Sequence, residues 1–156
     1  MGVMELLSLK GKNALIIGGS KGLGEGIAKG LAEAGAAVVV SSRNQADCDK
    51  AAEMIASSTG GTALGIAADI STKEGVDGLV NAMIEKLGHI DILVNSAGVN
   101  IRKPAIEYTV EDWDKVQDVQ LKGVFLACQA VGKHMIEKGI RGKIINISSI
   151  NARVVA

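Results

Sequence analysis

The feature that most constrains the fold of this sequence is a glycine cluster between a short apolar run and a helix-like segment. Residues 14–17 have the length and bulk of a buried parallel strand. Five glycines follow within residues 18–26, and an alanine- and leucine-rich segment begins near residue 23. A strand that turns into a helix through glycines leaves free backbone N–H groups at the positive end of the helix dipole. Such a turn binds anions, most often the pyrophosphate of a dinucleotide.

The spacing of the cluster is Gly18-x-x-x-Gly22-x-Gly24, which differs from both the G-x-G-x-x-G and the G-x-x-x-x-G-K-[ST] patterns of phosphate-binding loops. Tight turns also collect glycine without any ligand, because glycine adopts positive φ at little steric cost. The cluster alone therefore leaves two interpretations open, an anion site and a ligand-free turn.

The composition narrows the class of protein. The chain has 156 residues, enough for one domain with a core, and 47% of them are apolar. Since the sequence holds one Trp, one Tyr and one Phe, the core must consist mainly of aliphatic side chains, which is typical of a parallel sheet under helices. The 17 basic residues equal the 17 acidic ones, so no bulk charge attracts nucleic acid or an anionic membrane. No apolar run approaches the ~20 residues of a membrane span, and residues 1–10 do not resemble a secretory signal.

The cysteines and histidines are isolated in the sequence. Cys48 and Cys128 lie far apart and show no C-x-x-C spacing, which predicts two reduced thiols. His89 and His134 have no second candidate ligand at a useful spacing. We therefore expect a cytoplasmic protein without a metal site.

Strand-like and helix-like segments alternate along the chain. Candidate strands cover residues 14–17, 36–40, 62–68, 90–94 and 143–147, and candidate helices cover residues 23–34, 44–56, 72–87 and 110–138. Either Ser71 or Thr72 caps the third of these helices. The alternation predicts right-handed crossovers and an α/β fold, a Rossmann-type doubly wound parallel sheet with strand order 3-2-1-4-5.

The ends of the five candidate strands share a chemical character. An open parallel sheet binds ligands at the carboxyl ends of its strands. Here those ends are residues 18–24, 42–43, 69–70, 95–98 and 148–149, and polar or glycine residues occur at all five. This agreement favours the anion site over the ligand-free turn.

Three of these segments resemble motifs of the short-chain dehydrogenase/reductase family. The glycine cluster resembles its cofactor loop, residues 95–98 (Asn-Ser-Ala-Gly) are similar to its Asn-Asn-Ala-Gly element, and residues 144–149 are similar to the strand that carries its catalytic serine. The resemblance extends from residue 9 to about residue 152, and residues 100–104 look most like the gluconate and deoxygluconate dehydrogenase branch. It implies an oxidoreductase that interconverts a secondary alcohol and a ketone, with a sugar acid or small carbonyl compound as candidate substrate. It also implies a homo-oligomer formed through the helix at 110–138.

The resemblance assigns candidate cofactor contacts. Asn95, Ala97 and Gly98 would line the ribose on the nicotinamide side, although a plain turn after the fourth strand is compatible with the same residues. Asp69 and Ile70 would contact the adenine, unless Asp69 only caps the next helix. The contacts expected from the glycine loop are Gly18, Ser20, Lys21, Gly22, Leu23 and Gly24.

The end of the second strand distinguishes NADP(H) from NAD(H). An acidic residue there would accept both ribose hydroxyls of NAD and repel a 2′-phosphate, but Ser42 occupies this position. Arg43 follows it and Lys21 lies in the glycine loop, and two cations with a hydroxyl suit a phosphate dianion. We therefore expect NADP(H) in preference to NAD(H). The alternative is that both cations are solvated surface charges.

The catalytic residues of the family are only partly present. Ser149 resembles the serine that hydrogen-bonds the reacting oxygen, and Gln120 stands where a proton-relay asparagine is common. The family's Tyr-x-x-x-Lys pair, whose tyrosine is the general acid/base, does not occur in the printed chain. We interpret residues 1–156 as a single dinucleotide-binding domain that lacks the catalytic helix and the later strands, with a sheet that is incomplete on its C-terminal side, and we expect the chain by itself to be inactive. The alternative function is a non-catalytic dinucleotide-binding or assembly module.

Overall fold

A computed structural model describes residues 2–149 of the chain. Residue 1 and residues 150–156, which include the end of the family resemblance near residue 152, lie outside the described residues. Five parallel strands form one sheet in the order β3-β2-β1-β4-β5, so the strand order expected from the sequence is confirmed. The strands are β1 (Asn13–Ile17), β2 (Ala37–Ser42), β3 (Ala63–Ala67), β4 (Ile92–Asn95) and β5 (Lys143–Asn146).

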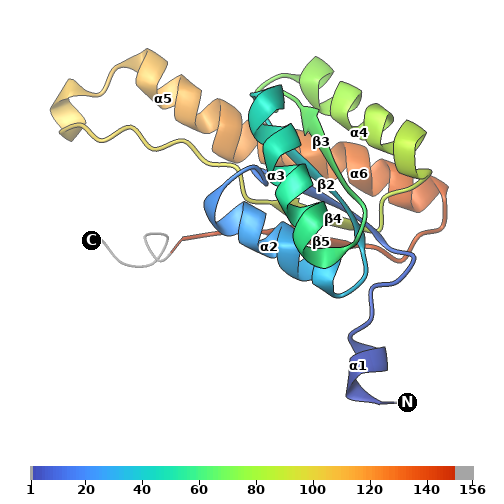
Figure 1. The fold of residues 1–156 in the computed structure, drawn as a ribbon. Coiled ribbons are helices and arrows are strands. Elements are labelled where there is room, and N and C mark those ends of the chain that lie inside the picture. The colour runs from blue at the N-terminus through green and yellow to red at the C-terminus, as the bar shows by residue number, and fades with distance from the viewer. Residues whose placement is uncertain (1, 150–156) are drawn as a thin grey trace.

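Helices connect the strands and cover both faces of the sheet (Figure 1). α2 and α3 pack on one face, and α4 and α6 pack on the other. The short α1 stands apart near the N-terminus, and α5 extends beyond the sheet. The helices are α1 (Val3–Leu6), α2 (Gly22–Glu33), α3 (Gln45–Thr59), α4 (Lys73–Leu87), α5 (Val110–Gln117) and α6 (Val124–Glu137), with a 3₁₀ turn, η1, at Ala105–Glu107.

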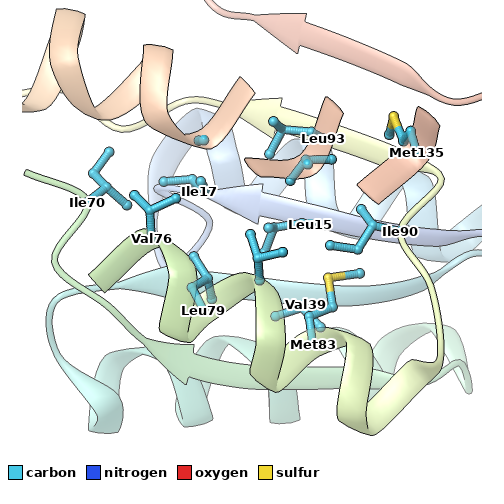
Figure 2. Close-up of a cluster of buried hydrophobic side chains, with 13 residues drawn as sticks. Leu15, Ile17, Val39, Ile70, Val76, Leu79, Met83, Ile90, Leu93 and Met135 are labelled. Carbon is cyan, nitrogen blue, oxygen red and sulfur yellow. The ribbon is translucent and has the colours of Figure 1, made fainter. Parts of the chain in front are cut away.

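The strands divide the core into two layers because successive side chains point to opposite faces of a sheet. In β1, Ile16 packs with the layer under α2 and α3, whereas Leu15 and Ile17 pack with the layer under α4 and α6. Figure 2 shows this second layer, in which Leu79 and Met83 of α4 lie against the side chains of the central strands. With both faces of β1 covered, the strand is a continuous apolar run rather than an alternating one.

The long helix predicted at 110–138 forms, but it contains one wide turn. α5 continues directly into η2 (Asp118–Gly123), a π-helical segment, and then into α6. A π-turn inserts an extra residue into the helix, and such turns often mark functional positions. Gly123 permits close packing here, since a Cβ atom at this residue would lie 2.7 Å from the carbonyl oxygen of Ile70. The widened turn therefore packs against the segment that joins β3 to α4.

A charged network ties the amino-terminal ends of β1 and β4 together. The Asp91 side chain is only 7% exposed and accepts hydrogen bonds from the Asn13 backbone N–H (2.9 Å) and from Lys12 Nζ (3.0 Å). His89 Nε2 lies 2.9 Å from Asp91 Oδ2. Burial raises the pKa of Asp91, but the two hydrogen bonds and the charges of His89 and Lys12 outweigh burial and leave this pKa below its usual value.

β5 lies at one edge of the sheet and is partly uncovered. Ile144 and Ile145 are 39% and 44% exposed, in contrast to the buried residues of β1 and β4. The sheet is thus incomplete on the C-terminal side, as the sequence predicts. No helix within residues 2–149 combines the length and the apolar character needed to cross a bilayer.

Candidate functional site

A cavity of about 320 Å³ opens at the carboxyl edge of the sheet, where the loops after β1, β2, β3 and β4 converge. It brings together most of the cofactor contacts predicted from the sequence. These are Gly18, Ser20, Lys21, Leu23, Gly24, Ser42, Arg43, Asp69, Ile70, Ala97 and Gly98. Gly22, Asn95, Gln120 and Ser149 are the predicted site residues that do not line it.

Two glycines determine the shape of the loop after β1. Gly18 has φ +82°, and a Cβ atom there would lie 2.5 Å from the backbone nitrogen of Ala97. A Cβ atom at Gly24 would lie 2.1 Å from the carbonyl oxygen of Gly18. The loop therefore contacts the segment after β4 on one side and the start of α2 on the other, without space for side chains at either contact.

The start of α2 differs from the starts of α3, α4 and α5. α3, α4 and α5 each begin with a capping side chain, from Asn44, Thr72 and Thr109, which accepts a hydrogen bond from a backbone N–H of the first turn. Lys21 precedes α2, and within the described part of the chain its side chain makes no capping hydrogen bond. The first N–H groups of α2 thus remain available at the cavity, where the helix dipole favours an anion.

Charged side chains of both signs line the cavity. Lys21 and Arg43 supply two cations, and Asp47 and Asp69 supply two carboxylates. Hydrogen bonds from the hydroxyl and backbone N–H of Ser71, together with the Arg43 charge, hold the pKa of Asp69 below its usual value. The residue that caps α4 is Thr72, so the alternative in which Asp69 caps this helix is wrong. The Asp69 carboxylate instead accepts a hydrogen bond from the Ser71 backbone N–H, just before the helix.

Asn95 lies behind the cavity rather than in its wall. Its side chain donates to Asn146 Oδ1 (2.8 Å), which joins the ends of β4 and β5, and it also contacts Cys128 Sγ at 3.4 Å. Asn95 Oδ1 is buried and has no hydrogen-bond partner within residues 2–149. Asn95 therefore ties β4 to β5 and α6, whereas the loop that follows it at 96–99 lines the cavity.

Gln120 connects the widened helical turn to that same loop. Its Oε1 atom accepts a hydrogen bond from the Val99 backbone N–H at 2.8 Å and lies near Gly98. The preceding residue, Val119, lines the cavity directly. The π-turn thus holds the loop after β4 in place through one side-chain amide.

Comparison with known proteins agrees with this architecture. The family model described as short chain dehydrogenase matches residues 12–156. The chain belongs to this family. The resemblance predicted from the sequence motifs is therefore confirmed, and the cavity lies at the carboxyl edge of a Rossmann-type sheet.

Individual short-chain dehydrogenases show how much of the fold is present. The chain is 39% identical to 2-dehydro-3-deoxy-D-gluconate 5-dehydrogenase of Escherichia coli (strain K12) over 148 residues, which cover 95% of this chain and 57% of that protein. It is also 39% identical to gluconate 5-dehydrogenase of Gluconobacter oxydans over 155 residues, covering 96% and 58% of the two chains. The chain thus spans less than two thirds of the length of these relatives.

Solved structures of the family superpose closely. A short-chain type dehydrogenase/reductase from Mycobacterium marinum gives a TM-score of 0.95 at 36% identity, covering 100% of this chain and 63% of that one. A gluconate 5-dehydrogenase from Burkholderia cenocepacia J2315, solved in complex with NADP and tartrate, gives a TM-score of 0.91 at 37% identity and covers 99% and 60% of the two chains.

The residue that resembles the family's catalytic serine lies beyond the end of β5. Ser149 is exposed and is not one of the residues that line the cavity. Tyr108, the single tyrosine of the chain, is half-buried between η1 and α5. No lysine follows it four residues on, since Asp112 occupies that position.

Seven residues that line the cavity were not predicted from the sequence. Most of them adjoin predicted contacts, so widening each predicted segment by a few residues would have found them. Val119 is reached in the same way from Gln120, although it comes from a helix distant in sequence from the strand ends. The seven are Ile17, Asn44, Asp47, Ala68, Ser96, Val99 and Val119. In residues 2–149 no group of three or more His, Cys, Asp or Glu side chains could hold a metal ion.

Proposed function

We propose that residues 1–156 form a single dinucleotide-binding domain of an NADP(H)-dependent oxidoreductase that interconverts a secondary alcohol and a ketone. The observation that carries this proposal is the cavity in which the uncapped start of α2 meets Lys21, Ser42 and Arg43. A sugar acid or a related small carbonyl compound is the proposed substrate class. The gluconate and deoxygluconate dehydrogenases among the relatives support this class.

The residues of the cavity fit the separate parts of a dinucleotide. The free N–H groups at Gly22–Gly24 suit the pyrophosphate. The absence of a side chain at Gly24 keeps this turn tight, because a Cβ atom there would clash with the Gly18 carbonyl oxygen. Asp69 and Ile70 suit the adenine, and the backbone at Ala97 and Gly98 suits the ribose on the nicotinamide side. When bound, the nicotinamide would donate or accept the hydride. The chain's own residues would bind and orient the cofactor.

The preference for NADP(H) rests on charge at the end of β2. Arg43 presents planar N–H donors that suit a phosphate dianion, and Ser42 adds a hydroxyl where a carboxylate would repel it. Asp47 opposes this preference, because its carboxylate also lines the cavity. The Burkholderia gluconate 5-dehydrogenase, which was solved with NADP, supports the proposal.

Calorimetric titration with NADPH and NADH tests the cofactor proposal. The unmodified chain should bind NADPH more tightly, and Arg43→Ala should weaken NADPH binding about tenfold, the scale of one charge-assisted hydrogen bond, while leaving NADH binding nearly unchanged. Arg141→Ala is the matched control, since Arg141 is exposed and lies outside the cavity. Equal affinity of the unmodified chain for the two cofactors would contradict the proposal.

The proposed catalysis needs a proton donor that these 156 residues do not supply. Ser149 would orient the substrate oxygen, but a serine hydroxyl is a weak acid, and the printed sequence contains no Tyr-x-x-x-Lys pair. We expect the 156-residue chain to bind NADPH without reducing ketones, because loss of general acid/base help alone costs ~10²–10⁴ in rate. NADPH oxidation with a panel of ketones and keto-sugar acids tests this expectation, with the Gluconobacter gluconate 5-dehydrogenase as the positive control. Turnover by the 156-residue chain near the rate of the control would contradict the expected inactivity. NADPH binding without turnover agrees both with this expectation and with the alternative function, a non-catalytic dinucleotide-binding module.

A second copy of the chain is the proposed partner of the outer face of α5, η2 and α6. Trp113, Leu121 and Phe125 are 59%, 66% and 60% exposed on this segment. Large apolar side chains in such numbers are typical of association surfaces. We therefore include a homo-oligomer formed through residues 110–138 in the proposed function.

A further inference from the structure

Cys48 is fully buried directly beneath the part of the cavity proposed for the 2′-phosphate. It lies in the first turns of α3, with 0% of its surface exposed. Its Sγ atom is 3.1 Å from the backbone nitrogen of Ser42 and 3.2 Å from Ser42 Oγ. Two other oxygens, the carbonyls of Ser42 and Ile66, are each 3.8 Å from the sulfur. The thiol therefore contacts both the backbone N–H and the hydroxyl of Ser42, which lines the cavity.

One of the two hydrogen bonds between Cys48 and Ser42 has a fixed direction, and the other can run either way. A backbone N–H can only donate, so the sulfur accepts the Ser42 N–H. The thiol has a single proton and three oxygens within reach, Ser42 Oγ at 3.2 Å and the two carbonyls at 3.8 Å, so either the thiol or the hydroxyl can donate in the Ser42–Cys48 pair. When the thiol donates to Ser42 Oγ, the hydroxyl keeps its own proton for another acceptor. Among residues 2–149 the carbonyl oxygen of Asn44 is such an acceptor, but at 3.4 Å it makes only a weak bond.

We propose that Cys48 is a positioning residue that makes the Ser42 hydroxyl a hydrogen-bond donor toward a 2′-phosphate. A phosphate dianion only accepts hydrogen bonds, so it gains from a hydroxyl whose proton points outward. A plain ribose hydroxyl both donates and accepts, and it gains less from this orientation. Cys48 therefore contributes to the discrimination between NADP(H) and NAD(H), an inference that rests on the proposed cofactor preference.

The first turn of α3 is fixed on the sheet, which keeps the sulfur in place. Gln45 Nε2 donates to the carbonyl oxygen of Gly65 at 3.0 Å, and its Oε1 accepts the Ala67 N–H at 2.7 Å. A Cβ atom at Gly65 would lie 2.6 Å from the carbonyl carbon of Cys48, so helix and strand pack without an intervening side chain. With the helix held this closely, the thiol lies beside Ser42 before any cofactor binds, so the contact costs no rearrangement on binding.

The test is the ratio of the dissociation constants for NADH and NADPH, measured by calorimetry on the full chain. In Cys48→Ala this ratio should fall by about two- to twelvefold, the range for one neutral hydrogen bond, chiefly through weaker NADPH binding. In a Ser42→Ala background, Cys48→Ala should leave the ratio unchanged, because the hydroxyl that it orients is absent. Retained NADH binding verifies that each variant is folded. If Cys48→Ala does not fold, Cys48→Ser replaces it. The ratio for Cys48→Ser should lie between the ratio of the unmodified chain and the lower ratio expected for Cys48→Ala.

The outcomes separate this inference from the proposed function. A wild-type chain that binds both cofactors equally would contradict the NADP(H) preference itself. A wild-type preference that survives Cys48→Ala unchanged would overturn the role of Cys48 and leave the preference intact. Equal weakening of NADPH and NADH binding by Cys48→Ala would also overturn the role of Cys48. The same is true if Cys48→Ala changes the ratio equally with and without the Ser42 hydroxyl. A thiol with only a structural role would produce both results.

Discussion

Substituting Gly24 by alanine should destabilise the chain even though alanine is the better helix former. The added Cβ would lie 2.1 Å from the Gly18 carbonyl oxygen, and Cβ atoms essentially never approach within 3.0 Å of another heavy atom. The start of α2 must therefore move by about 0.9 Å, the difference between 2.1 and 3.0 Å, relative to a backbone atom that cannot rotate away. Overpacking of this kind costs ~1–3 kcal/mol, and its upper end applies where backbone must move.

The helix propensity of alanine offsets part of this cost. It favours alanine over glycine inside a helix by about 1 kcal/mol, so the net loss in the free energy of unfolding is about 2 kcal/mol. For a chain of this size the midpoint of thermal unfolding should fall by about 4–8 °C. Because the displaced backbone carries the N–H groups of the proposed pyrophosphate site, NADPH binding should also be lost.

Gly26→Ala is the matched control for this prediction. Gly26 lies in the interior of the same helix, and a Cβ there would meet nothing within 4 Å. This variant should gain ~0.5–1 kcal/mol and retain NADPH binding. Urea denaturation and calorimetry on both variants measure the two effects. The reasoning would be refuted if Gly24→Ala were as stable as Gly26→Ala, or if the two variants bound NADPH equally well.

Three further substitutions test other parts of the structure. Asp91→Asn should lower the free energy of unfolding near neutral pH by about 1–3 kcal/mol. In urea denaturation this difference should be constant above the unfolded pKa of about 3.9 and vanish as the pH falls through the lowered folded-state pKa of Asp91; a pH-independent difference would contradict it. Gln120→Ala should increase hydrogen exchange of the Val99 amide about two- to twelvefold, and unchanged protection in NMR exchange would contradict the 2.8 Å bond. Phe125→Glu should shift sedimentation toward monomer while Met54→Glu, on the far side of the sheet, should not; an equal response would contradict the proposed interface.

Much of the fold is readable from the sequence because its signals are local. A buried parallel strand is a continuous apolar run, and β1 and β2 therefore appear within one or two residues of their predicted bounds. Asn44 and the glycines after each helix mark the helix ends directly. Strand order follows from the alternation of strands and helices, since crossovers of one hand leave few arrangements of the sheet.

The candidate site is predictable to the extent that it consists of strand ends. Parallel strands bring their carboxyl ends to one edge whatever the details of packing, so Gly18, Ser42, Asp69 and Ala97 meet at one cavity as expected. The assignment of a role to each residue goes beyond this argument and remains a proposal. Asn95 illustrates the limit, because a strand-end position did not reveal that its side chain points to Asn146 rather than into the cavity.

The sequence by itself determined which segments form strands and helices, the order of the strands, and the edge of the sheet at which a ligand would bind. Tertiary structure alone decided the contacts between elements that are distant along the chain. The Gln120 side chain reaches Val99 because a widened turn of the helix passes the end of β4, and the Cys48 thiol reaches Ser42 because α3 packs closely on Gly65. Both contacts depend on distances of a few ångströms between separately formed elements, and no local periodicity or propensity encodes such distances.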